Sequence, residues 1–252
     1  MLLELQQTII YGPVRSRRLG RSLGINVLPA RRKVCSFNCV YCQYGWEESV
    51  GRADIEASTF PAVEEIERAV KAALAGIDPP PAYVTFSGNG EASLHPDFTD
   101  LVERITHLRD RLAPAAQTAI LSNSSTASDP EVRQALSRLD VRIMKLDVGC
   151  PQDLTAYNRP AATVELETIL DGLTSLKDVT IQTLFSTGPM GNCHPKNITP
   201  WIACLKKISP KLVQIYTLDR PSPTEAICRV PKEELLSLQE RLHQEHIRAD
   251  VF

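Results

Sequence analysis

Residues 34–43 read VCSFNCVYCQ, and the three cysteines in this stretch are the most informative feature of the chain. They lie at Cys35, Cys39 and Cys42, which gives the spacing CxxxCxxC. Thiolates are soft ligands, so cysteines this close together favour an iron–sulfur cluster, zinc or Cu(I). Such sites usually have four protein ligands, but the next cysteine along the chain is Cys150. The triplet therefore predicts a metal centre that keeps one position open for a ligand from outside the protein.

The triplet is also compatible with simpler roles. The thiols can be buried and inert, or they can bind structural zinc with a remote ligand such as His95 or His194. A disulfide framework fits poorly, because the chain has seven cysteines, an odd number, and starts with MLLELQQ, which lacks the basic start of a signal peptide. We therefore expect reduced thiols and a cytoplasmic location.

The composition is that of an ordinary globular protein. The 252 residues fit one domain with a sizeable core, and 43% of them are apolar while 23% are charged. The longest uncharged apolar runs are far too short to span a bilayer, so we expect no membrane association. The net charge of −2 gives the whole molecule no general attraction to nucleic acid.

The triplet, with the aromatic Tyr41 directly before its last cysteine, resembles the motif of the radical S-adenosylmethionine (SAM) superfamily. The resemblance implies that Cys35, Cys39 and Cys42 hold a [4Fe–4S] cluster whose fourth iron is chelated by the amino and carboxylate groups of SAM. It implies that the reduced cluster cleaves SAM to methionine and a 5′-deoxyadenosyl radical, which abstracts hydrogen from a substrate. Tyr41 is expected near the adenine of SAM.

Apolar runs alternate with helical patterns along the chain. Asp129 and Pro130, for example, form a favourable N-cap followed by proline at the first helical position. The predicted strands cover 22–29, 83–87, 118–122, 141–148, 179–185 and 212–217. The predicted helices cover 63–74, 98–112, 130–139, 164–176, 200–208 and 233–246.

These units predict a parallel sheet with right-handed crossovers. A complete eight-unit barrel typically needs about 250 residues, and this chain uses about fifty of its residues for the cysteine loop and the segment before it. The predicted fold is therefore α/β, an incomplete (βα)6 parallel barrel, which the resemblance implies as well. We expect a single domain over 1–252, with an N-terminal extension (1–21), the partial barrel (22–246) and a tail (247–252).

The segment after the second predicted strand, residues 88–96, reads GNGEASLHP. Glycines allow a backbone to approach a ligand closely, and the Glu91 carboxylate can accept hydrogen bonds from an ammonium group. The segment resembles the GGE motif of the superfamily in its GEPTLHP form, with Ala92 in place of the usual proline. The resemblance implies that the amino end of SAM is bound by Gly88, Asn89, Gly90 and Glu91. The alternative is a simple turn between a strand and a helix.

Polar residues also lie at the carboxyl ends of the next two predicted strands, where functional residues of parallel α/β folds gather. Asn123 and Ser124 resemble the strand end of the superfamily that lies near the ribose or carboxylate of SAM, although they also suit helix capping. Asp147 is expected to point into the barrel mouth and to contact SAM or the substrate. Lys145 shares its strand face, since side chains alternate with a period of two, so a structural Lys–Asp pair is the alternative.

Some further residues are weaker candidates. Gln182 and Thr183 interrupt an apolar run and need buried partners or a ligand. Arg220 offers a cation for a substrate anion or for a rim ion pair, and Asn158 with Arg159 matches an NRP run of one branch of the superfamily. The remaining cysteines are scattered singly and are expected to be core or surface thiols, namely Cys150, Cys193, Cys204 and Cys228.

The segment before the triplet is rich in basic residues. They are Arg15, Arg17, Arg18, Arg21, Arg31, Arg32 and Lys33. They predict either a solvated, mixed surface or an anion-binding rim for a carboxylate, a phosphate or an RNA backbone.

The opening of the chain, residues 11–20 and 22–25, resembles a branch of the superfamily that is grouped with the wyosine-type tRNA synthases. The resemblance extends from about residue 11 to residue 240. Tricyclic wyosine-base synthases carry a second cysteine set before the triplet, whereas no cysteine precedes Cys35 here. The branch therefore does not fix the substrate.

The sequence thus predicts a radical SAM enzyme that abstracts hydrogen from an unidentified substrate. An incomplete barrel has a lateral opening, which suits a peptide, a protein or RNA. The expected partners are SAM, the substrate and an electron donor such as flavodoxin or ferredoxin. Two alternatives remain: an Fe–S electron carrier, which would not need the segment 88–91, and a zinc-stabilised RNA-binding module, which only the arginine-rich segment favours.

Overall fold

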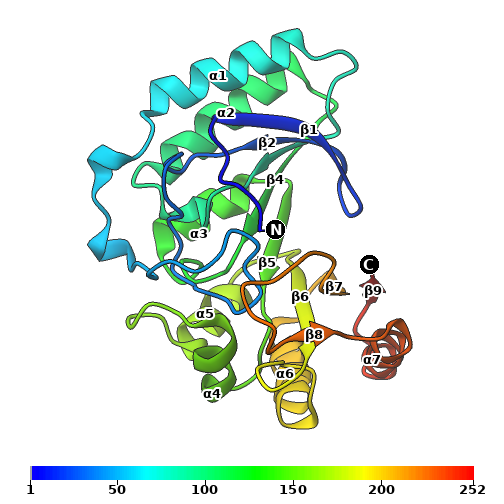
Figure 1. The fold of residues 1–252 in the computed structure, drawn as a ribbon. Helices are drawn as coiled ribbons and strands as arrows, with labels where there is room; N and C mark the ends of the chain where they lie inside the picture. The colour runs from blue at the N-terminus through cyan, green and yellow to red at the C-terminus, as the bar shows by residue number, and fades with distance from the viewer. Residues whose placement is uncertain (1) are drawn as a thin grey trace.

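The computed structural model describes residues 2–252, whose strands form one predominantly parallel sheet (Figure 1). The strand order is β1-β2-β3-β4-β5-β6-β7-β9, and β8 pairs with β6. Among the strand pairs of residues 2–252, only β1–β2 and β6–β8 are antiparallel. The strands from β2 to β7 are the six that the sequence predicts, so the incomplete (βα)6 barrel is confirmed.

The boundaries of the elements are as follows. The strands are β1 (Ile10–Ser16), β2 (Gly20–Ile25), β3 (Tyr83–Phe86), β4 (Gln117–Ser122), β5 (Val141–Lys145), β6 (Thr180–Thr187), β7 (Leu212–Thr217), β8 (Cys228–Arg229) and β9 (Ala249–Val251). The helices are α1 (Val63–Gly76), α2 (Phe98–Leu112), α3 (Pro130–Arg138), α4 (Pro151–Asp153), α5 (Leu166–Thr174), α6 (Pro195–Ile208) and α7 (Lys232–Gln244). Short helical turns cover Arg52–Asp54, Ala57–Thr59, Ala92–Leu94 and Leu154–Asn158.

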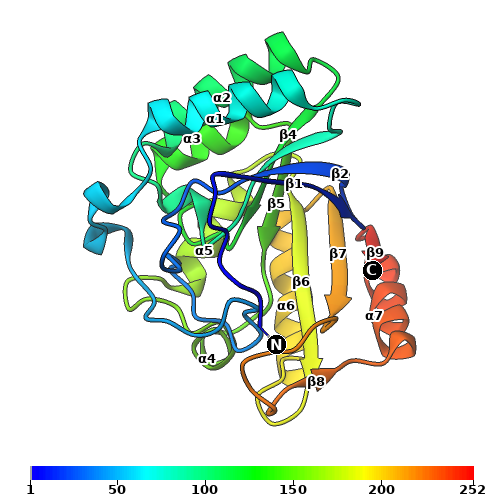
Figure 2. The same ribbon diagram turned by 45° about the horizontal axis from the view of Figure 1, so that its top comes forward.

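The helices cover the outer side of the sheet. Figures 1 and 2 show α1, α2 and α3 together over the strands from β1 to β4, and α6 behind β6 and β7. Aromatic side chains join the two layers: the rings of Phe98 on α2 and Phe86 on β3 have centroids 5.9 Å apart, and those of Trp201 on α6 and Phe185 on β6 are 5.0 Å apart. All four side chains are almost completely buried, so this layer fixes the strands against the helices.

The helix start predicted at Asp129 and Pro130 is confirmed. Asp129 caps α3, since its Oδ1 accepts hydrogen bonds from the backbone nitrogens of Glu131 (2.9 Å) and Val132 (3.3 Å), and Pro130 is the first helical residue. The strand predicted over 141–148 is shorter than expected and ends at Lys145. Asp147 therefore lies in the loop after β5.

The two ends of the chain differ from the prediction. The N-terminal extension contains β1, which pairs with β2, and the expected tail contains β9, which pairs in parallel with β7. The assignment of 247–252 as a tail is therefore corrected: these residues complete one edge of the sheet. None of the helices among residues 2–252 combines the length and the apolar character that crossing a bilayer requires.

The sheet stays open between β1 and β9, and the turn between β1 and β2 reaches toward the other edge. Arg17 Nη2 in this turn lies 2.6 Å from Asp219 Oδ2, just after β7. Arg18 Cζ lies 4.5 Å from the centroid of the Tyr216 ring on β7. The turn thus bridges part of the lateral opening that an incomplete barrel leaves.

Candidate active site

The three cysteines of the triplet line one cavity of about 360 Å³. The turn after β3 and the end of β4 line the same cavity, and β5, β6 and β7 each contribute polar side chains to it. The polar lining includes Arg18, Lys33, Glu91, Asn123, Lys145, Gln182 and Tyr216. The strand ends thus meet the cysteine loop at one place, as parallel α/β folds predict for a functional site.

Backbone hydrogen bonds hold the cysteine loop from two sides. On one side, Val34 N donates to Asn89 O (2.9 Å) and Glu91 N donates to Val34 O (2.9 Å). On the other side, Val40 N donates to the carbonyl oxygen of Tyr157 (2.9 Å). The loop is therefore positioned by the turn after β3 and by the segment that follows α4.

The glycines of the turn after β3 are required by this close approach. Gly90 has a φ of +136°, and a Cβ atom there would lie 1.9 Å from Val34 O. Gly88 has a φ of +132°, and a Cβ there would lie 2.5 Å from Asn26 Oδ1. The sequence predicts that these glycines let the backbone approach a ligand closely. In the structure they make room for the cysteine loop and for Asn26.

Glu91 is 1% exposed and lines the cavity. Its Oε1 accepts hydrogen bonds from Ser93 N (3.1 Å) and Ser93 Oγ (2.6 Å), and its Oε2 accepts one from Asn123 N (2.5 Å). Burial raises the pKa of Glu91, while these hydrogen bonds oppose the rise. The carboxyl group therefore joins the turn after β3 to the end of β4.

Asn89 and Ser124 are two of the three predicted cofactor residues whose side chains lie outside the cavity lining. Asn89 Nδ2 donates to Gln6 O and Pro29 O, both at 2.9 Å, so this side chain fixes the N-terminal segment. Ser124 Oγ donates to Lys145 O at 2.7 Å, and the φ of Ser124 is +74°. Both side chains therefore stabilise the fold. Asn123, by contrast, lines the cavity.

Asp147 is a buried acceptor that fixes Tyr41. Its carboxylate accepts hydrogen bonds from the Tyr41 hydroxyl, from Asn158 Nδ2 (2.8 Å) and from Leu184 N (2.9 Å). Lys145 Nζ lies 3.4 Å from Asp147 Oδ1 and 4.9 Å from the centroid of the Tyr41 ring. Asp147 is only 2% exposed and does not line the cavity, whereas Tyr41 does. The predicted Lys–Asp pair therefore exists; Lys145 lines the cavity, whereas Asp147 lies behind its wall.

Each sulfur of the triplet has a nitrogen donor of its own. Asn123 Nδ2 lies 3.5 Å from Cys35 Sγ, and Asn158 Nδ2 lies 3.3 Å from Cys39 Sγ. Lys33 Nζ lies 3.8 Å from Cys42 Sγ, and it also donates to Gly45 O (2.7 Å) and Asn38 Oδ1 (3.1 Å). Lys33 is predicted to lie on a solvated, mixed surface or in an anion-binding rim, but its side chain is buried against the cysteine loop.

These surroundings fit an iron–sulfur cluster. Burial raises the pKa of Cys39 to about 11 and also raises that of Cys35, so the free thiols stay protonated until a metal displaces the protons. No three His, Cys, Asp or Glu side chains within residues 2–252 already form a compact metal cage. The fit therefore rests on the donor set: three thiols in one cavity, each beside an N–H group that favours thiolate character.

The other cysteines do not line this cavity, in agreement with their expected role as core or surface thiols. Cys150 Sγ lies 3.1 Å from Asp153 Oδ2, and Cys193 Sγ lies 3.3 Å from Glu234 Oε1. Cys204 is buried, whereas Cys228 is exposed.

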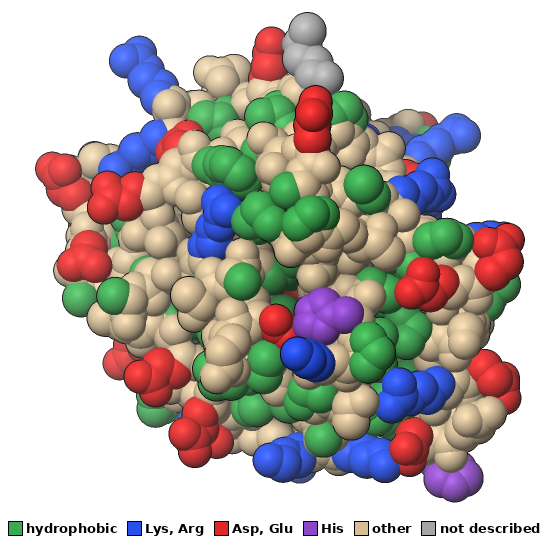
Figure 3. Space-filling model, turned by 60° about the horizontal axis from the view of Figure 1, so that its bottom comes forward, with side chains coloured by type: hydrophobic (Ala, Val, Ile, Leu, Met, Phe, Trp, Pro, Cys, Tyr) green, Lys and Arg blue, Asp and Glu red, His purple; other side chains and the backbone are tan. Residues whose placement is uncertain are grey.

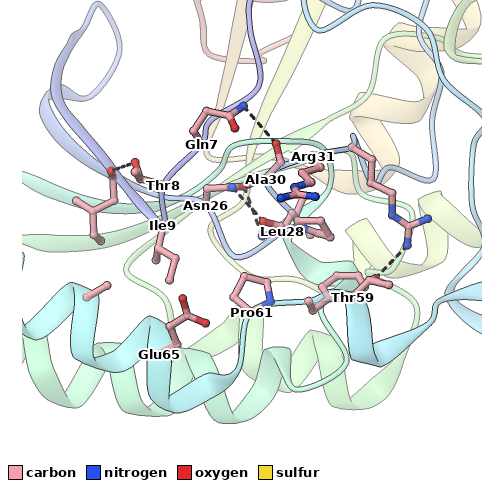
Figure 4. A pocket seen from close by; sticks show the side chains of 15 residues that line it. Gln7, Thr8, Ile9, Asn26, Leu28, Ala30, Arg31, Thr59, Pro61 and Glu65 are labelled. Carbon is pink, nitrogen blue, oxygen red and sulfur yellow. Dashed lines mark hydrogen bonds between the residues drawn. The ribbon is translucent and has the colours of Figure 1, made fainter.

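A second cavity of about 830 Å³ is larger but lies elsewhere (Figure 4). It is lined by the N-terminal segment, by the chain after β2 and by the start of α1, and it includes Arg31, Arg32 and Glu65. Neither the triplet nor the turn after β3 contributes to it. The chemistry of the triplet therefore belongs to the smaller cavity.

Comparison with known proteins identifies the family. The family model of the radical SAM superfamily matches residues 33–193. A UPF0026 protein of Synechocystis sp. is 34% identical over 218 residues, which cover 86% of this chain and 77% of that protein. A UPF0026 protein of Helicobacter pylori is 31% identical over 235 residues, which cover 90% of this chain and 71% of that protein.

Solved structures share the fold at low sequence identity. SuiB of Streptococcus suis bound to S-adenosylmethionine has a TM-score of 0.65 at 11% identity, over 91% of this chain and 50% of that one. TYW1 with a lysine-pyruvate adduct bound has a TM-score of 0.62 at 16% identity, over 89% and 73% of the two chains. A radical SAM methyltransferase from Sphaerobacter thermophilus has a TM-score of 0.63 at 13% identity, over 92% and 65%. The family match, the relatives and the fold agree: this chain is a radical SAM enzyme of the UPF0026 group, and its cofactors are a [4Fe–4S] cluster and SAM.

Proposed function

We propose that Cys35, Cys39 and Cys42 bind the cluster, and that a substrate which enters the same cavity loses a hydrogen atom there. The observation that carries this proposal is the single cavity shared by the three sulfurs, the turn after β3 and Asn123. When bound and reduced, the cluster supplies the electron that cleaves SAM. The protein supplies the position of each group and the exclusion of water.

The 88–91 turn is proposed to bind the amino end of SAM, mainly through Glu91. Its carboxylate lines the cavity and accepts hydrogen bonds from Ser93 N, Ser93 Oγ and Asn123 N, with the Ser122 side chain as a further neighbour. An ionised carboxylate is an acceptor only, so it suits an ammonium group that enters the cavity. Asn89 is proposed to support the turn and not to contact SAM: its side chain is bonded to Gln6 and Pro29, and its backbone N and O are bonded to Asn26 Oδ1 and Val34 N.

The other predicted cofactor residues divide into contacts and supports. Tyr41 lines the cavity, and we propose that its ring faces the adenine of SAM. Asp147 holds the Tyr41 hydroxyl, and Ser124 holds the end of β5 through Lys145 O. Both are therefore proposed as positioning residues.

The substrate and the electron donor belong to the proposal as well. The donor is a protein of the flavodoxin or ferredoxin type, and the enzyme acts in the cytoplasm. A peptide substrate has a precedent in SuiB, which shares the fold and has been solved with the precursor peptide SuiA. Lys and Arg side chains alternate with Asp and Glu on the face shown in Figure 3, with no continuous basic surface there that would favour RNA.

Anaerobic reconstitution with iron and sulfide tests the metal assignment. We expect about four irons per chain, as one [4Fe–4S] cluster requires, because the three thiols share a cavity with N–H donors at each sulfur. Iron, sulfide and zinc are measured on the same sample. One zinc per chain without iron would support the zinc-stabilised module instead.

Replacement of Lys33 by methionine is expected to lower the reduction potential of the reconstituted cluster. Lys33 Nζ lies 3.8 Å from Cys42 Sγ, and loss of this cation disfavours the reduced state, which carries the extra negative charge. A tenfold loss in the equilibrium constant for reduction corresponds to about 59 mV for one electron. Potentiometric titration followed by EPR measures the shift. Lys71→Met, on the exposed side of α1, is the matched control; equal potentials in the two variants would refute the role of Lys33.

A further inference from the structure

A network of polar side chains lies on the β5–β7 side of the cavity and has no role in the proposed cluster site. Lys145 Nζ on β5 donates to the Tyr216 hydroxyl on β7 at 2.9 Å. The Tyr216 hydroxyl donates to Gln182 Oε1 on β6 at 3.2 Å, and Gln182 Nε2 donates to Gln214 Oε1 at 3.2 Å. These side chains thus fix one another in a network that spans three strands.

Arg18 adds a cation to this network. The turn between β1 and β2 carries it to the cavity, and its Cζ lies 4.5 Å from the centroid of the Tyr216 ring. Stacking on an aromatic face fixes the plane of a guanidinium group. Among residues 2–252, Arg18 Nη1 is buried and has no hydrogen-bond partner. Burying a donor without an acceptor is unfavourable, so we expect an acceptor from outside the chain at this position.

The acidic groups near the cavity are already committed. Asp147 accepts bonds from Tyr41, Asn158 and Leu184 N and pairs with Lys145, while Glu91 accepts three bonds from Ser93 and Asn123. Asp219, close to the same turn, pairs with Arg17 and lies 3.8 Å from Arg229 Nη2. The guanidinium of Arg18 has no ion pair within the described residues, so it faces the cavity with an uncompensated charge.

Arg18 lies on a different side of the cavity from the groups proposed to bind the amino end of SAM. Those groups follow β3 and β4, whereas Arg18 stacks on Tyr216 of β7. Neighbouring strands are about 4.8 Å apart, so β4 and β7 are separated by roughly 14 Å along the curved sheet. Tyr41 lies closer to Arg18, because Lys145 Nζ is 4.9 Å from the Tyr41 ring and 5.2 Å from the Tyr216 ring. A second molecule that binds at Arg18 would therefore lie beside SAM, next to Tyr41.

We propose that Arg18, supported by Lys145 and Tyr216, binds an oxyanion of the substrate, either a carboxylate or a phosphate group. A planar guanidinium fork matches both groups and binds them through two parallel hydrogen bonds. The substrate of this enzyme is therefore an anion, held by its charged group on the β7 side of the cavity. This inference rests on the proposed function, because the hydrogen abstraction site is taken to be the end that the triplet lines.

The test uses the reconstituted, oxidised holoenzyme with saturating SAM and without reductant, titrated calorimetrically with inorganic phosphate and with acetate. The wild type is expected to bind at least one of the two anions saturably, and the better ligand identifies the class of oxyanion. Arg18→Gln should weaken that binding about ten- to hundredfold, as the loss of a charge-assisted hydrogen bond predicts. Arg17→Gln is the matched control, because Arg17 is exposed and pairs with Asp219.

Each other outcome would overturn the inference. Equal anion affinity of Arg18→Gln and the wild type would show that another group binds the oxyanion. A parallel loss of SAM affinity in Arg18→Gln would identify the oxyanion as the carboxylate of SAM itself. No anion binding by the wild type would show that the position is not a subsite. Failure of the proposed function is a separate result, because it appears as a wild type without iron or without SAM cleavage.

Discussion

Replacement of Gly90 by alanine is expected to remove most of the iron that the reconstituted protein binds. The new Cβ would lie 1.9 Å from Val34 O, and that oxygen accepts the hydrogen bond that joins the cysteine loop to the turn after β3. Gly90 also has a φ of +136°, where an alanine backbone is strained by about 1–3 kcal/mol. The atom that the new Cβ meets belongs to the backbone and not to a flexible side chain, so Val34 and the neighbouring Cys35 must move.

The expected loss of stability is large as well. For a chain of this size, about 1 kcal/mol lowers the melting temperature by about 2–4 °C, so the strain at Gly90 alone predicts a fall of several degrees. Iron analysis and thermal unfolding of the same samples measure both effects. Gly20→Ala is the matched control, since Gly20 also has a positive φ, +68°, but a Cβ there meets no atom within 4 Å. A Gly90→Ala protein with the iron content and melting temperature of this control would show that the close approach of Val34 does not require glycine.

The sequence predicts the architecture well because the relevant signals are local. The apolar runs that became β2 to β7 alternate with helical patterns, and each run is buried in the sheet as its composition indicates. The edge strands β1 and β9 were missed for a physical reason. β9 has only three residues, and β1 contains Gly12 and Pro13 within a run that is mostly half-buried or exposed. β1 is a strand because it pairs with β2, and β9 is a strand because it pairs with β7. A local sequence pattern does not indicate such pairing.

The candidate site was predicted in part. The gathering of the triplet, Glu91 and Asn123 follows from motifs at strand ends, and the structure places these groups around one cavity. The direction of the Asn89 side chain could not be predicted, because it depends on Gln6, which is 83 residues away along the chain.

The nitrogen donors of the sulfurs escaped the sequence analysis for a similar reason. Asn158 meets Cys39 across 119 residues, and only the NRP run marked it as unusual. The run of basic residues around Lys33 predicts either a solvated surface or an anion-binding rim, yet its ammonium group has three acceptors inside the cysteine loop. A basic run in a sequence does not show which of its members is buried.

Replacement of Cys39 by alanine is expected to abolish cluster binding while the fold is retained. Two thiols cannot hold the cluster in place of three, and Cys39 Sγ is the acceptor for Asn158. The variant removes only one sulfur from the cavity, so α1 to α7 and the sheet keep their packing. Iron content, the visible absorbance of the cluster and the far-UV circular dichroism spectrum measure these effects. Cys204→Ala is the matched control, because Cys204 is also buried but lies outside the cavity.

The yield of 5′-deoxyadenosine shows whether the triplet cluster cleaves SAM in this cavity. The reconstituted wild type and the Cys39→Ala variant are incubated anaerobically with SAM and dithionite, and the product is quantified by chromatography. We expect 5′-deoxyadenosine and methionine from the wild type and from Cys204→Ala, and only background from Cys39→Ala. A wild type that carries a full cluster and forms no 5′-deoxyadenosine, or a Cys39→Ala variant that forms as much as the wild type, would contradict this expectation.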